Sequence, residues 1–309
     1  MMISKWTRES NNPIIPIKSK SWKEDVTATP DIIRVGEKYF LYYAGQSKGY
    51  EQIGVMTIDK GKFNGKTWND YFGNPVLKVG NLGDFDSKYV TDPATVNVNG
   101  TIYLYHSGIG EGPDSIGLAT SADGYNFKKY TFNPIFEGRA PEVVYRNGLF
   151  YLFYADENEA GGYQINLAIS KDGYNFKKYR KNPMFRGSRD WDSCSVTTPR
   201  IFYESDGNYY MVYAADNEFK DLPRYFGLAV SKDLYSWKSY SDSPFFEVGK
   251  PGTWDDKAIW FGTVYKFGNA YFMWYEGCST KGISQIGLAK TGKEVLLGKE
   301  DKNNYFGFS

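Results

Sequence analysis

The segment Phe127-Lys128-Lys129-Tyr130-Thr131-Phe132-Asn133-Pro134-Ile135-Phe136 decides the fold, because the chain contains five versions of it. Each version has an aromatic residue followed, six positions later, by Asn-Pro or Ser-Pro and two apolar residues. The versions begin at Trp6, Trp68, Phe127, Phe176 and Trp237, with spacings of 62, 59, 49 and 61 residues. Self-similarity of this kind is typical of propellers and other repeat proteins. The sequence therefore predicts five structural units.

Three further segments recur in a fixed order between these versions. A stretch centred on a proline comes first, then an aromatic run such as residues 150–154, then a short Ile-Gly-Leu-Ala segment such as residues 116–119. The runs are rich in β-branched and aromatic residues, and Asn-Gly or Asp-Gly pairs between the first two predict tight hairpins. No stretch has sustained helical periodicity. Four strands in each of five units predict an all-β, five-bladed β-propeller.

The first version of the repeated phrase also predicts how the ring closes. It precedes the first inner strand, and the last unit has no version after it. We therefore expect an N-terminal strand over residues 5–16 to complete the last blade and leave no open edge. The alternative outer strand is Val295-Leu296-Leu297. A single domain is expected over residues 1–309. The expected blades cover residues 21–77, 85–136, 137–185, 190–246 and 253–290.

Composition excludes several classes of partner. The chain has 37 Lys and Arg against 36 Asp and Glu, so it lacks the basic excess of a nucleic-acid-binding protein. No apolar run approaches the length of a membrane span, and residues 1–6 lack the hydrophobic core of a signal peptide. We expect no membrane partner and a cytoplasmic location, or a secreted protein if a signal has been removed.

The cysteines and the single histidine give little sign of a metal site. Cys194 and Cys278 fall in different units, without zinc or redox spacing, and are interpreted as reduced structural thiols. Because His106 is the only histidine, a multi-histidine metal site is excluded and a Ser-His-Asp triad is unfavourable. We interpret His106 as a packed strand residue; a ligand of a hydrated ion or a substrate contact is the alternative. We expect no required cofactor. A structural calcium ion in the central channel is an alternative, since water and backbone carbonyls could hold it.

The inner strands of a propeller converge on its channel, so the residues beside the aligned prolines are candidates for the site. The aligned centres are Pro30, Pro93, Pro141, Pro199 and Gly262. The residues before them are Thr29, Asp92, Ala140, Thr198 and Phe261, and those after them are Asp31, Ala94, Glu142, Arg200 and Thr263. Repeats usually reuse small or apolar residues at equivalent places. A position that varies among Asp, Glu, Arg and Thr is therefore interpreted as adapted to a ligand.

A second equivalent position opens the inner strands with an aromatic ring followed by acids. The rings are Trp22, Phe85, Trp191 and Trp254, and the acids are Glu24, Asp25, Asp86, Asp192, Asp255 and Asp256. Strand entries at one end of the ring would gather these acids around one mouth. The alternative is that each acid caps a turn by accepting hydrogen bonds from backbone amides.

The chain resembles a known family at several of these segments. Residues 116–124 leading to Asn133-Pro134-Ile135-Phe136, Thr91-Asp92-Pro93-Ala94 and residues 140–145 look like the five-bladed propeller glycosidases, which include glycoside hydrolase families 43, 32 and 130. The resemblance spans about residues 6–290. It implies a carbohydrate substrate and two carboxyl groups across the scissile bond, one of them with a raised pKa. The family's base commonly lies in an Asp-Pro of the first blade, where this chain has Thr29-Pro30. Its Glu-x-Pro acid motif is not evident.

The resemblance and the repeat alignment together suggest roles for particular residues. Asp92, in an intact Asp-Pro, is the one position that matches a family catalytic motif. Further catalytic candidates, by expected geometry alone, are Asp25, Asp31, Glu142 and Asp192. We choose Glu142 as the acid, because its apolar neighbours would raise its pKa. Candidate substrate contacts are Arg139 and Arg200 for an anionic group, Trp22, Trp191, Trp254 and Trp260 as sugar platforms, and Asp256. The arginines could equally pair with acids, and the tryptophans could pack between blades.

Three functions are compatible with this sequence. The favoured hypothesis is a glycoside hydrolase or phosphorylase acting on a furanoside or another small glycan. The second is a glycan-binding propeller that has lost catalysis. The third is a cytoplasmic enzyme of surface-polysaccharide synthesis that transfers or modifies a sugar.

Overall fold

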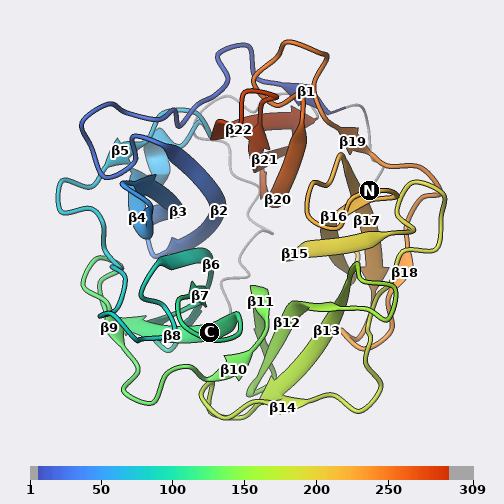
Figure 1. The fold of residues 1–309 in the computed structure, drawn as a ribbon, viewed down its shortest axis with the longest axis horizontal. Coiled ribbons are helices and arrows are strands. Elements are labelled where there is room, and N and C mark those ends of the chain that lie inside the picture. The colour runs from blue at the N-terminus through green and yellow to red at the C-terminus, as the bar shows by residue number, and fades with distance from the viewer. Residues whose placement is uncertain (1–5, 292–309) are drawn as a thin grey trace.

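A computed structural model shows small β-sheets arranged around a central axis (Figure 1). The structure describes residues 6–291. Within this range the only helical element is the short 3-10 segment η1 (Lys60–Lys62). None of residues 6–291 forms a helix that is long and apolar enough to cross a membrane.

Five blades follow one another along the chain, and each begins with its inner strand. The first contains β2 (Val26–Val35), β3 (Lys38–Ser47), β4 (Tyr50–Asp59) and β5 (Asn69–Asp70). The second contains β6 (Tyr89–Val98), β7 (Thr101–Ile109), β8 (Ser115–Ser121), β9 (Lys128–Lys129) and β10 (Phe136–Glu137). The third contains β11 (Arg139–Arg146), β12 (Leu149–Glu157), β13 (Tyr163–Ser170) and β14 (Lys177–Lys178). The fourth contains β15 (Ser195–Tyr203), β16 (Tyr209–Asp216), β17 (Tyr225–Ser231), β18 (Lys238–Ser239) and β19 (Phe246–Glu247).

The fifth blade joins the two ends of the described chain. It contains β20 (Ala258–Phe267), β21 (Ala270–Cys278) and β22 (Ser284–Thr291), and its outer strand is β1 (Thr7–Arg8), which pairs with β22. This confirms the predicted five-bladed, all-β fold and the expected place of the N-terminal strand. The alternative outer strand, Val295-Leu296-Leu297, lies outside the described residues.

The asparagine of the repeated phrase explains why the phrase recurs. In four versions its side-chain amide makes two hydrogen bonds to one residue of the third strand of the blade, accepting from the backbone N–H and donating to the C=O. The pairs are Asn12 with Leu288, Asn74 with Val55, Asn133 with Leu118 and Asn182 with Leu167. The amide thus continues the outer edge of the sheet beyond outer strands only two residues long.

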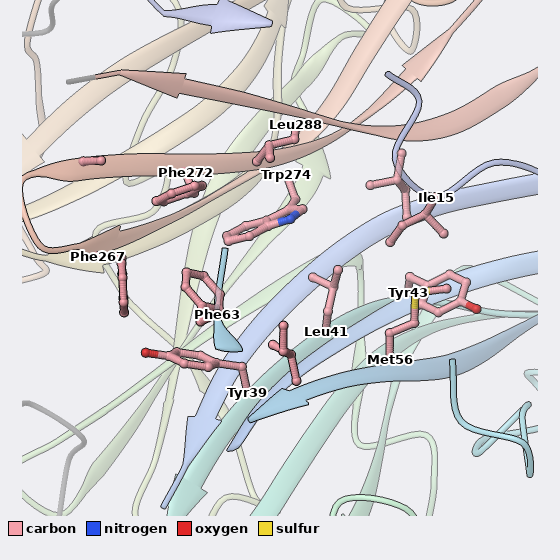
Figure 2. Packing of buried hydrophobic residues seen from close by; sticks show 13 residues of the cluster. Ile15, Tyr39, Leu41, Tyr43, Met56, Phe63, Phe267, Phe272, Trp274 and Leu288 are labelled. Atoms are coloured by element: carbon pink, nitrogen blue, oxygen red, sulfur yellow. The ribbon is translucent and has the colours of Figure 1, made fainter. Parts of the chain in front are cut away.

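The hydrophobic core is divided among the seams between neighbouring blades. Figure 2 shows the seam between the first and last blades, where Phe63 lies among Tyr39, Phe267, Phe272 and Trp274. Four further clusters fill the other seams. Since both faces of a blade are covered, its aromatic second strand is apolar at successive residues rather than at alternate ones.

Each inner strand carries a β-bulge at the aligned proline or glycine. The pairing of inner and second strands shifts register there in all five blades. The residue before the proline or glycine has a left-handed backbone, with φ of 50° at Thr29, 55° at Asp92, 49° at Ala140, 46° at Thr198 and 52° at Phe261. Strain of this kind is often found at functional sites. The bulges therefore mark the inner strands as the place to look for the site.

Candidate active site

The five bulges come together around one pocket of about 290 Å³. Thr29, Asp92, Ala140, Thr198 and Phe261 all line it. Asp92 is the one of these five that carries a titratable side chain. The sequence alignment on the prolines thus identified five residues that share one pocket.

Asp92 is held by hydroxyl groups on both of its oxygens. Ser107 donates to Oδ2 at 2.7 Å, and the Thr91 hydroxyl lies 3.2 Å from Oδ1. Asp92 is only 6% exposed, and burial raises its pKa above the usual value, although these hydrogen bonds and the charges of Arg139 and Arg200 act in the opposite direction. Asp92 is therefore buried but surrounded by groups that favour its ionised form.

Three more carboxyl groups line the same pocket: Glu51 from β4, Glu276 from β21, and Asp221, which accepts a hydrogen bond from Arg139. Removal from bulk water raises the pKa of Glu51 to about 7, and the charge of Asp92 acts in the same direction. Burial raises the pKa of Glu276 to about 8, with further contributions from Glu51 and Asp92. Glu276 accepts a hydrogen bond from the Thr29 amide at 3.3 Å. The pocket thus brings together four acids, of which Glu51 and Glu276, with pKa values of about 7 and about 8, are suited to donate a proton.

The lining also contains a basic side chain and aromatic rings. Arg139 lines the pocket and donates to the Tyr163 hydroxyl at 2.6 Å and to Asp221 at 3.2 Å. Asp114 lies 3.9 Å from the same guanidinium group. Trp260 and Phe261 add ring surface to the wall. Arg139 is thus already paired with acids, and Trp260 is the one predicted sugar platform that lines this pocket.

The residues after the prolines do not line the pocket; they form a buried polar cluster on the axis. Arg200 donates to Glu142 at 3.3 Å and to the carbonyls of Pro93 and Pro141, both at 2.9 Å. Asp31 accepts from the Thr95 amide and hydroxyl at 2.9 and 2.5 Å. Burial raises the pKa of Asp31, and that of Glu142 to about 8, although Arg200 opposes both shifts. We expected these side chains to face a ligand, but the structure places them against other blades.

The acids at the strand entries also lie outside this pocket. Asp192 is buried and accepts from the amides of Ser188 and Arg189 at 2.8 and 2.7 Å, as a turn cap does. Asp256 accepts from the Gly252 and Thr280 amides, both at 2.7 Å. Asp25 is exposed and accepts from the Lys48 amide at 3.1 Å. These three acids thus do not line the pocket of Asp92, and they accept hydrogen bonds from backbone amides, as in the turn-capping alternative.

The tryptophans that open the inner strands pack inside their own blades. A Cβ atom at Gly45 or Gly54 would lie 2.3 or 2.4 Å from the Trp22 ring, so glycine is required where the ring crosses the sheet. Trp254 covers Gly277 and Gly287 in the same way, and Trp191 covers Gly227. Packing thus explains these three rings, although an edge of Trp22 also lines a separate surface groove.

Glu51 and Glu276 were missed by sequence reasoning, yet the repeats contain a signal for each. Glu276 pairs with Trp260 across the sheet, at the place where the other second strands have Ala44, Ser107, Ala155 and Ala214. Glu51 stands two residues before Ile53, where the other units have Asp114, Tyr163, Arg224 and Ser284. Comparing the second and third strands as closely as the first would have found both.

The remaining candidates for metal or redox chemistry are the two cysteines and the histidine, of which Cys194 is partly exposed and Cys278 and His106 are buried. Cys194 and Cys278 are both free thiols. His106 is fully buried and stacks on Phe85 at 5.9 Å, as expected of a packed strand residue. Within residues 6–291 no group of three or more His, Cys, Asp or Glu side chains is arranged to hold a metal ion.

Comparison with solved structures shows the same fold in carbohydrate-active proteins. A glycosyl hydrolase from Bacteroides ovatus is 17% identical, with a TM-score of 0.72 and 96% and 95% of the two chains covered. The β-1,2-mannobiose phosphorylase from Listeria innocua, solved with β-1,2-mannobiose, is 14% identical, with a TM-score of 0.73 and coverage of 93% and 97%. An N-acetylgalactosamine deacetylase from F. plautii, solved with blood group B trisaccharide, is 16% identical, with a TM-score of 0.72 and coverage of 93% and 96%.

Sequence comparison with protein families gives two overlapping matches. The β-1,4-mannooligosaccharide phosphorylase family, glycosyl hydrolase family 130, matches residues 126–277. Glycosyl hydrolases family 43 matches residues 3–195, more than half of the chain. No curated protein matches the sequence. The resemblance to propeller glycosidases is confirmed, and the chain belongs to glycosyl hydrolases family 43.

Proposed function

We propose that this protein cleaves a glycosidic bond of a small glycan or furanoside in the channel pocket, with Asp92 and Glu276 as its two carboxyl groups. The observation that carries the proposal is that both side chains line one pocket although they are only 6% and 8% exposed. Glycoside cleavage needs two such groups in opposite protonation states.

The surroundings of the two acids favour different protonation states. Asp92 has hydroxyl donors and the charge of Arg139 nearby, so we assign it the ionised role of base or nucleophile. Glu276 contacts an amide and a hydroxyl group, and no cation among residues 6–291 pairs with it. We therefore assign it the neutral role, in which it protonates the leaving oxygen.

The shape of the pocket supports a small substrate. Its volume of about 290 Å³ is at the small end of ligand-binding sites. Trp260 offers a rigid apolar surface beside the acids, which suits the face of a sugar ring. Carbohydrate ligands in the related structures support the same substrate class.

The proposal is tested with a panel of aryl and alkyl furanosides and pyranosides, each assayed with and without inorganic phosphate. We expect Asp92→Asn to lower kcat/KM by a factor of about 10² or more on every substrate of the wild-type protein. Glu276→Gln should lose far more activity on alkyl glycosides than on 2,4-dinitrophenyl glycosides, because a good leaving group does not need an acid. The exposed Asp59→Asn is the matched control. Full activity of Asp92→Asn would rule out this mechanism, and dependence on phosphate would identify phosphorolysis.

One observation favours a second function, a propeller that binds glycans without cleaving them. Thr29 lies at the pocket where the family commonly has its aspartate. In that case the wild-type protein would bind an oligosaccharide in a calorimeter but release no product from any member of the panel.

A further inference from the structure

The Thr91 hydroxyl lies between two carboxyl groups of the pocket. Its oxygen is 2.5 Å from Oε1 of Glu51 and 3.2 Å from Oδ1 of Asp92. A hydroxyl group has a single hydrogen to donate, and an ionised carboxylate can only accept. Both contacts are therefore full two-centre hydrogen bonds only if one of the two acids is protonated and donates to Thr91.

The neighbours of Asp92 decide which acid carries the proton. The Ser107 oxygen accepts the Ala140 amide at 2.9 Å, which directs its own hydrogen to Oδ2 of Asp92 at 2.7 Å. Arg139 and Arg200 add positive charge near the same carboxyl. Glu51, by contrast, has Thr91 as its one side-chain hydrogen-bond partner among the described residues. The negative charge therefore belongs on Asp92 and the proton on Glu51.

We propose that Thr91 is a positioning residue: its hydroxyl accepts a hydrogen bond from protonated Glu51 and donates its hydrogen to ionised Asp92, so that the pair holds one proton. The catalytic value of this arrangement rests on the function proposed above. It keeps Asp92 charged in a buried pocket while Glu51 stays neutral beside it. The other ionisable groups that act on the pair are Glu276 from β21 and the two arginines, Arg139 from β11 and Arg200 from β15. The Cys278 thiol is a further titratable group near Glu276, and burial and the charge of Glu276 raise the pKa of the thiol.

Carboxyl ¹³C NMR titration tests the arrangement without any substrate. Signals are assigned with Asp92→Asn and Glu51→Gln. We expect wild-type Asp92 to titrate below Glu51. In Thr91→Val the pKa of Asp92 should rise, because a donor is lost, and that of Glu51 should fall, because its neutral form loses an acceptor. The two values should approach each other by about one pH unit, whereas Thr91→Ser should keep the wild-type separation. An unchanged separation in Thr91→Val would overturn the proposal.

Glu51→Gln gives a second test that does not depend on how Thr91→Val folds. Glutamine is neutral and keeps a donor for Thr91, as protonated glutamate does. The pKa of Asp92 should therefore stay within about half a unit of the wild-type value. If Glu51 is instead ionised, its replacement removes a neighbouring negative charge, and a clear fall in the pKa of Asp92 would refute the shared proton. Retained activity in Asp92→Asn would remove the proposed function but leave these titrations as the test of the hydrogen-bonded pair.

Discussion

At the scale of single residues, one position of the second strand has a tyrosine in four blades and a histidine in the second blade, and the hydrogen bonds of the side chain differ accordingly. In the last two blades a tyrosine hydroxyl donates to a buried aspartate, Tyr213 to Asp192 at 3.2 Å and Tyr275 to Asp255 at 2.8 Å. The second blade has His106 at this position instead. Its Nδ1 lies 3.2 Å from the Ser107 carbonyl, and its Nε2 has no hydrogen-bond partner in the described part of the chain. Burial lowers the pKa of His106 to about 4.

This histidine should make stability depend on pH. Between about pH 6.5 and pH 4 the unfolded chain binds a proton at His106 that the folded protein does not. The free energy of unfolding should therefore decrease as the pH is lowered through this window, by at most about 3 kcal/mol from this residue. His106→Tyr restores the side chain of the other blades and should lack this component. Urea unfolding of both proteins at pH 7, 5.5 and 4.5 checks the prediction; equal losses in the two would contradict it.

At the scale of elements, the blades owe their outer edge to side chains as well as to backbone. The outer strands β1, β5, β9, β14 and β18 each contain two residues. The asparagine that follows them bonds both backbone groups of a third-strand residue, as Asn182 does with Leu167 at 2.9 and 3.0 Å. Ser243, the equivalent residue of the fourth blade, is exposed, and its side chain makes no such pair in the described structure.

The two positions form a matched pair of tests. We expect Asn182→Ala to lower the free energy of unfolding by about 1–3 kcal/mol, because two backbone groups of Leu167 lose their partner. Ser243→Ala should change it by less than about 0.5 kcal/mol. Urea unfolding measures both, and comparable losses would show that the amide pair does not stabilise the blade.

At the scale of the whole molecule, a polar cluster on the axis links the inner strands. Arg200 donates to the carbonyls of Pro93, Pro141 and Pro199, and the Thr263 hydroxyl donates to that of Pro30 at 2.7 Å. All four aligned prolines thus present their carbonyls to this cluster. Within residues 6–291, a single parallel bridge between β6 and β4 is the only strand pairing that the inner strands make besides the pairing with their second strands. These bonds therefore satisfy carbonyl groups that would otherwise be buried without partners.

Removing the central cation should destabilise the ring as a whole. Arg200→Met leaves Glu142 and Asp31 buried without their positive neighbour, and we expect a loss of about 3–5 kcal/mol in the free energy of unfolding. The double variant Arg200→Met with Glu142→Met should lose less, because one of the unpaired acids is also gone. Urea unfolding compares the three proteins. A double variant less stable than Arg200→Met alone would argue against charge pairing as the cause.

Local patterns in the sequence were enough to predict the fold and part of the pocket. Each repeated phrase predicts the same blade wherever it occurs, so five phrases imply five blades and place the N-terminal strand in the last one. The aligned prolines likewise located the five bulge residues, and Asp92 among them, since a bulge is a local property of its strand.

Only the tertiary structure decided where each side chain points and which groups it contacts. The bulge places Asp92 in the pocket, whereas Asp31 and Glu142, one residue beyond their prolines, meet Thr95 and Arg200 of other blades. Glu51 and Glu276 reach Asp92 from other strands and from residues 41 and 184 positions away. Local pattern determines which segments become strands, because hydrogen bonding and turn preference act between near neighbours. The packing of strands that are distant in the sequence determines which acids share a pocket. The sequence of a single strand does not specify this packing.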